Sequence, residues 1–333
     1  MRSVFKALQY GFAVSAACVF LLFFATEAWA NGPAGSPGDK AAKFRQLETE
    51  LPTPNMYRGA SGAPGPAYWQ QQADHKIDVK LDENKQRLTA KMSITYTNNS
   101  PDPLSYIWLA LDQNRFKDGS TARMSEVASA VGTRRDASGK GDSYSFTALR
   151  RHQGFEDKEY GFEFTEISYA NGRKLDYIIN DSMMRLNLDS PLAPNASLTF
   201  NVNWEHNIID EEAIGGRGGY EHFPETDNYI FALAQWFPRL AAYTDYTGWQ
   251  NKQFLGRGEF TLEFGNYEVD ITVPADHVVA ATGVLQNPRN VMTALQRRRL
   301  EDANTNEITF IVTPDEAKNA ETRKSTGTKT WRF

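Results

Sequence analysis

The sequence predicts a mainly β protein, a large antiparallel β-sandwich with short helical insertions. Three observations predict it. Apolar and polar residues alternate along most of the chain from Tyr68 onward, turn-forming residues separate the alternating runs, and only two stretches lack this alternation. The chain length suits one large β domain or two smaller ones, and it is ample for a sizeable core.

Residues 1–30 have the features of a secretory signal peptide. A short basic start precedes an apolar run over residues 12–25, and an Ala-Trp-Ala sequence ends at Ala30, where a signal peptidase would cleave. We therefore expect an exported protein, periplasmic or secreted, or membrane-anchored if the signal stays uncleaved. The single cysteine, Cys18, lies inside the apolar run, so the mature chain would have no disulfide and no thiol ligand or nucleophile.

The charge and composition of the rest of the chain indicate what kind of partner it can bind and where its folded domain begins. Removing residues 1–30 takes two basic residues and one acidic residue from a chain of net charge −5 and leaves −6. This balance argues against nucleic acid as a partner, since nucleic acid binding calls for a basic face. Residues 31–67 are rich in Gly, Pro, Ala and Ser and are expected to form a flexible linker, with a short helix over residues 39–51. Residues 68–333 would then form the β domain.

The expected strands follow in chain order. Residues 75–82 and 87–96 alternate with period two around a polar turn and predict an antiparallel hairpin with one wet face. Residues 104–112 predict a more buried strand. A second hairpin is predicted from residues 160–170 and 173–180, because Asn171-Gly172 readily adopts the positive φ angles of a tight turn. The further expected strands are residues 184–189, 198–206, 259–264, 267–274, 277–285 and 307–312.

Two stretches break the strand pattern. Residues 117–145 show no sustained apolar period and predict an excursion from the sheet. Residues 291–303 predict a short helix that carries Arg297, Arg298 and Arg299. Three adjacent arginines suggest either an anion site or a solvated helix face, and the solvated face is the commoner outcome.

The residues that usually carry catalysis form no recognisable set. No two of the five histidines are four residues apart, so no helix presents an H-x-x-x-H pair to zinc. Glu205 and His206 are neighbours in an expected strand and should point to opposite faces. Neither a G-x-S-x-G motif nor a phosphate-binding glycine loop is present. Residues 209–229 are acidic and glycine-rich; they predict a solvated mobile loop rather than a calcium site, and such a loop could help to recognise a cationic group.

Two long stretches resemble a known family. They are "DNYIFALAQWFPRLAAYTDYTGWQNKQFLGRGEFTLEFGNYEVDITVPADHVVAATGVL" and "YWQQQADHKIDVKLDENKQRLTAKMSITYTNNSPDPLSYIWLALDQN". Both resemble the N-terminal domain of aminopeptidase N-like zinc metallopeptidases, peptidase family M1. The resemblance covers nearly all of residues 68–333. It implies a saddle-like β-sandwich that packs on a thermolysin-like catalytic domain, which would follow Phe333, and a peptide as substrate.

The resemblance also implies a role for Gln235. In the family, a glutamine or glutamate of this domain helps to recognise the free amino terminus of the substrate, and Gln235 is the position that matches best. A neutral amide can accept a hydrogen bond from an ammonium group. The alternative is an amide that caps backbone groups near Pro238. Tyr229 and Trp236 are expected to shape the same wall.

The family's catalytic motifs are absent from the sequence. Neither G-x-M-E-N nor H-E-x-x-H occurs, so we expect no catalytic residue and no bound cofactor in this segment, with zinc implied only for a full-length protein. The sequence thus predicts the substrate-side domain of an exported zinc aminopeptidase, inactive alone. A stand-alone exported β-sandwich that acts as a binding module or scaffold remains the alternative.

Overall fold

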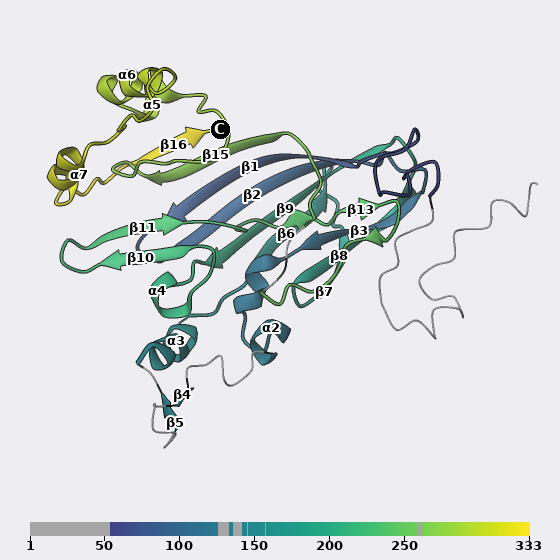
Figure 1. Cartoon of the computed structure of the whole chain (residues 1–333), viewed down its shortest axis with the longest axis horizontal. Coiled ribbons are helices and arrows are strands. Elements are labelled where there is room, and N and C mark those ends of the chain that lie inside the picture. Colours follow the sequence, from purple (N-terminus) through teal and green to yellow (C-terminus); the bar gives the residue numbers. More distant parts are fainter. Residues whose placement is uncertain are drawn as a thin grey trace, which may run out of the picture. The chain divides into compact units, whose positions relative to one another are not determined.

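The computed structural model describes residues 54–125, 133–135, 142–144, 146–156, 158–256, 258 and 261–333 (Figure 1). Residues 55–59 and 63–333 form one compact unit. The predicted signal peptide and the helix predicted over residues 39–51 lie outside the described residues. Within the described ranges, no helix is both long and apolar enough to cross a membrane.

The larger sheet has six strands, drawn side by side in Figure 1. In sheet order they are β16 (Thr328–Arg332), β15 (Tyr267–Pro274), β1 (Gln72–Asp82), β2 (Arg87–Thr97), β9 (Ser197–Asn207) and β6 (Glu163–Tyr169). The predicted first hairpin is confirmed, since β1 and β2 pair antiparallel with Ile77 opposite Met92. Every second residue of β1 from Ala73 is buried, as the apolar alternation predicts for a sheet with one face on the core.

The smaller sheet has four strands. In sheet order they are β12 (Arg239–Leu240), β3 (Leu104–Ala110), β8 (Met183–Leu192) and β7 (Asp176–Asn180). Side chains of both sheets, such as Ile107 and Leu186 from the smaller and Phe200 and Trp204 from the larger, belong to one continuous buried cluster. The mainly β, two-sheet architecture predicted from the sequence is therefore confirmed.

The second predicted hairpin is only partly present. The turn forms as expected, with Gly172 at φ +81° and the amide of Leu175 donating to the carbonyl of Ile167 at 3.1 Å. Beyond the turn the two strands separate, because β6 pairs with β9 in the larger sheet while β7 pairs with β8 in the smaller one. The turn thus connects the two sheets at a corner of the sandwich.

The sheet is also not wholly antiparallel, since β15 runs parallel to β1, with Ile77 opposite Val269. Both edges of β15 are taken, by β1 and β16, and residues 277–285 form no strand, so the strand predicted there is wrong. The strand predicted over residues 307–312 is also irregular, and the described part of residues 259–264 forms only isolated bridges, at Leu262 and Phe264.

Three small strand pairs and several short helices make up the remaining elements of the described residues. The pairs are β4 (Thr133–Arg135) with β5 (Asp142–Tyr144), β10 (Gly219–Phe223) with β11 (Asn228–Ala232), and β13 (Tyr243–Thr244) with β14 (Gly248–Trp249). The helices are η2 (Asp112–Phe116), α2 (Thr121–Met124), α3 (Phe146–Glu156), α4 (Glu211–Ile214), α5 (Pro288–Val291), α6 (Ala294–Asp302) and α7 (Pro314–Ala320). The prediction of a mobile loop over the acidic residues 209–229 is therefore wrong, because this segment contains α4 and most of the β10–β11 hairpin.

The arginine-bearing helix predicted over residues 291–303 is confirmed as α6 and the end of α5. Arg297 donates to the carbonyl of Met292 at 2.8 Å, and Arg299 pairs with Glu316 and donates to the carbonyl of Ile311 at 3.0 Å. Two of the three arginines thus hold neighbouring segments in place. This arrangement does not support an anion site at the arginine run.

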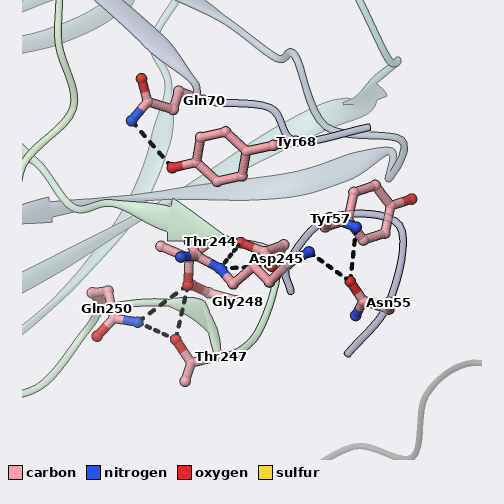
Figure 2. Close-up of polar contacts among 10 residues, drawn as sticks. Asn55, Tyr57, Tyr68, Gln70, Thr244, Asp245, Thr247, Gly248 and Gln250 are labelled. Atoms are coloured by element: carbon pink, nitrogen blue, oxygen red, sulfur yellow. Dashed lines mark hydrogen bonds and ion pairs between the residues drawn. The ribbon is translucent and has the colours of Figure 1, made fainter. Parts of the chain in front are cut away.

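Residues just before the β domain are anchored to it. Figure 2 shows the Asn55 side chain, which accepts from the amide of Tyr57 at 2.8 Å, close to the β13–β14 turn. Arg58 donates from Nε to both carboxylate oxygens of Asp245 at 2.9 Å, and its guanidinium lies over the rings of Tyr68 and Tyr246. The compact unit therefore includes residues 55–59, which the sequence assigns to the flexible linker.

Candidate functional site

Gln235 lies in the irregular segment between β11 and β12. Its backbone φ is +57°, a left-handed conformation that residues with a long side chain rarely adopt. Gln113, from η2, donates from Nε2 to the carbonyl oxygens of Ala234 at 3.3 Å and of Gln235 at 3.0 Å. These two hydrogen bonds hold the turn in its strained conformation, a feature that clusters at functional sites.

The side-chain amide of Gln235 has no hydrogen-bond partner among the described residues. The residue is half-buried. The capping role near Pro238, one of the two roles left open by the sequence, is therefore not found among the described groups. The amide is available to a molecule that approaches this turn.

Directly after Pro238 the chain joins the smaller sheet as β12, and a buried ion pair holds it there. Arg239 of β12 pairs with Asp112, and the two side chains are 11% and 1% exposed. Burial raises the pKa of Asp112, whereas the nearby guanidinium of Arg239 acts in the opposite direction. Because removing one charge of a buried ion pair is strongly destabilising, the pair fixes where the segment containing Gln235 ends.

Tyr229 and Trp236 flank the same turn on its two sides in the sequence. The Tyr229 ring stacks on His222 with ring centroids 4.5 Å apart and on Phe231 at 5.9 Å. Burial, with smaller contributions from Asp227 and Glu83, raises the pKa of Tyr229. Trp236 packs towards the core and contacts Phe237 at 5.0 Å between ring centroids.

Tyr229 and Trp236 both line a cavity of about 700 Å³, whereas Gln235 is not part of its wall. The floor is apolar and comes from β1, β2 and β15 through Val79, Leu81, Leu88, Ile271 and Val273. The remaining wall comes from β11, from residues 276–282 and from α7 and the residues after it. The structure thus brings two of the three predicted site residues to one cavity and places the third beside it.

One end of this cavity is polar, and sequence reasoning missed it. Nε2 of His277 lies 3.7 Å from a carboxylate oxygen of Glu83, and Nδ1 lies 3.3 Å from Asp276. Burial opposes ionisation of Asp276, but a hydrogen bond from the Ser325 amide and the contact with His277 lower the pKa of Asp276. Glu83 comes from the β1–β2 turn and His277 from the segment after β15, so no local spacing could have linked them.

The described residues do not fit a zinc site. No group of three or more His, Cys, Asp or Glu side chains among them is arranged to hold a metal ion. His75 and His206 are buried in the core, and burial lowers the pKa of His75 to about 4 and of His206 to about 3. Glu205 points away from His206 and binds Arg87 at 3.0 Å, as the strand alternation predicts.

Comparisons with known proteins give a limited result. No family model and no curated protein matches the chain. Among solved structures, it is similar to a mutant two-domain M1 zinc metallopeptidase bound to L-tryptophan, with 13% identity and a TM-score of 0.33, over 67% of this chain and 38% of the other. An M1 zinc metallopeptidase from Deinococcus radiodurans shows 12% identity and a TM-score of 0.33, over 65% and 35%.

The chain therefore spans well under half the length of these solved structures. At such identity and TM-score the similarity carries no argument about activity. What this chain does has to be argued from its own residues.

Proposed function

We propose that this chain is the substrate-side domain of an exported zinc aminopeptidase, and that Gln235 contacts the free amino terminus of the peptide. The proposal rests on the sequence resemblance and on one structural observation. Gln235 is held in a left-handed turn by two hydrogen bonds from Gln113, while its own side-chain amide is left without a partner among the described residues.

The chemistry of this contact is simple. The side-chain oxygen of Gln235 accepts a hydrogen bond from the ammonium group of the peptide and positions its first residue. The amide orients the substrate without transferring a proton. Zinc would be held by residues other than the described ones, because no group of three or more His, Cys, Asp or Glu side chains among the described residues is arranged to hold a metal ion. Hydrolysis would therefore depend on a second domain.

The test uses the complete product of the native gene and a series of aminoacyl p-nitroanilides. We expect Gln235→Ala to raise KM about 10- to 100-fold, because a hydrogen bond to a charged group contributes about 1.5–3 kcal/mol. Gln235→Glu should lower KM for the same substrates, because a carboxylate attracts the ammonium more strongly. Gln70→Ala, which removes an exposed glutamine elsewhere, is the matched control.

Two results would contradict the proposal. Unchanged KM in both Gln235 variants would leave this residue without a substrate contact. If the native gene product had no aminopeptidase activity, the proposed enzyme function would be contradicted, and the stand-alone binding module would be favoured.

A further inference from the structure

We propose that the cavity lined by Tyr229 and Trp236 binds an apolar molecule that carries a protonated amine, with the amine held between Glu83 and His277. This site is separate from the proposed role of Gln235, which is not part of the cavity wall. The proposal rests on three features: the apolar walls, two acceptors that receive no hydrogen bond from the described residues, and the placement of charge from the interior to the mouth.

The walls suit an apolar ligand body. A volume of about 700 Å³ falls within the range of small-molecule sites, which are mostly apolar with a few convergent polar groups. At the rim, Ile230, Leu233 and Val278 are 57%, 39% and 53% exposed. Exposed apolar side chains that continue into an apolar cavity are typical of a binding surface.

The first unpaired acceptor is Nε2 of His277. We assign the imidazole of His277 as neutral with its proton on Nδ1, because ionised Asp276, 3.3 Å from Nδ1, can only accept a hydrogen bond. Nε2 is then an acceptor. It is buried and has no hydrogen-bond partner among the described residues.

The second acceptor is the carboxylate of Glu83. Its side chain is 17% exposed, and it receives no hydrogen bond from the described part of the chain. It lies 3.7 Å from Nε2 of His277, too far for a hydrogen bond between the two groups. An ammonium has three donors and one positive charge, so it can satisfy both acceptors at once.

The mouth carries one acidic and two basic side chains, and solvent screens the charges of all three. Glu321, Arg323 and Lys324 lie there, all exposed. Lys324 is already bound to the carbonyl of Asp227 and to the side-chain oxygen of Asn228. Two carboxylates in the cavity wall have little access to solvent, with the side chain of Glu83 at 17% and that of Asp276 at 27% exposed, and their negative sign selects a cation.

The experiment compares three probes that share one body and differ in the head group: 4-phenylbutylamine, 4-phenylbutan-1-ol and 4-phenylbutyrate. Binding to the full chain is measured by titration calorimetry. We expect the amine to bind at least tenfold more tightly than the alcohol, and the carboxylate more weakly than both. Equal binding of all three, tighter binding of the carboxylate, or no binding of the amine would overturn the proposal.

Variants locate the site. Glu83→Gln should abolish the preference for the amine over the alcohol while the alcohol still binds, which also shows that the variant is folded. Glu225→Gln, which removes an exposed carboxylate at the turn of the β10–β11 hairpin outside the cavity, should keep the preference. Ala320→Phe, which fills the cavity from α7, should weaken all three probes. A preference that survives in Glu83→Gln would contradict the assigned head-group position.

The two proposals can fail separately. Gln235→Ala should leave the affinity for 4-phenylbutylamine unchanged, because Gln235 does not line the cavity. A loss of probe binding in this variant would mean that Gln235 belongs to the amine site and would contradict the separation of the two sites.

Discussion

Replacing Gln235 by glycine should stabilise the protein, although it removes the side chain proposed to contact the substrate. At φ +57° an L residue pays about 1–2 kcal/mol that glycine does not. Glycine in turn loses about 0.5–1 kcal/mol more backbone entropy than alanine on folding. The free energy of unfolding of the Gln235→Gly variant should therefore be about 0.5–1 kcal/mol higher than that of the Gln235→Ala variant.

Urea denaturation of the two variants measures this difference, with equal m-values as the condition for comparing them. The Gly and Ala variants both remove the same side chain, so their difference reports the backbone alone. The same pair of substitutions at Gln70, whose φ is not positive, serves as the control and should favour alanine. If glycine were the less stable variant at both positions, the turn at Gln235 would carry no strain and the structural support for its role would be lost.

Three further predictions concern buried charge. Asp112→Asn should lower the free energy of unfolding by about 3–5 kcal/mol in urea denaturation, because it removes one charge of a buried ion pair. The double variant with Arg239→Met should regain most of this loss, and failure to regain it would mean that the pair is not what fixes β12. The pKa of His206 is about 3 in the folded chain against 6.5 in the unfolded one. The contribution of His206 to the free energy of unfolding should therefore be complete above pH 6.5 and fall by up to about 1.4 kcal/mol per pH unit as the pH drops towards 4. His206→Phe should reduce this slope, and an unchanged slope would contradict the assignment. Burial raises the pKa of Glu263 to about 7, against the opposing hydrogen bond from the Tyr243 amide, so its stabilising contribution is complete below pH 4.5 and is lost as the pH rises through 7. Glu263→Gln should thus raise the unfolding free energy by about 1–2 kcal/mol at pH 8 and change it little at pH 4, and the same shift at both pH values would refute the argument.

The local structure of this protein was largely readable from its sequence. The alternation of Ile77, Val79 and Leu81 with polar neighbours predicted β1, and the buried positions of that strand follow it. Asn171-Gly172 predicted a tight turn, and a turn is found there. These features depend on residues close in the chain, because side-chain period and turn conformation are local properties.

Strand partners were less predictable. The sequence indicated that β6 and β7 form a hairpin, but β6 pairs with β9 in the larger sheet and β7 with β8 in the smaller one. The alternation in β15 predicted a strand but could not show that it runs parallel to β1. Pairing is decided by which distant edge is free when the core closes, and a single sequence does not record that.

The candidate site divides in the same way. The sequence alone selected Gln235, Tyr229 and Trp236 through their place in a stretch that resembles a family. Only the tertiary structure showed that Gln235 is held in a left-handed turn by Gln113, and that Glu83 and His277 meet at one end of a cavity. The physical reason is that backbone strain and unpaired acceptors result from contacts between distant segments, and such contacts exist only once the sheets have packed together.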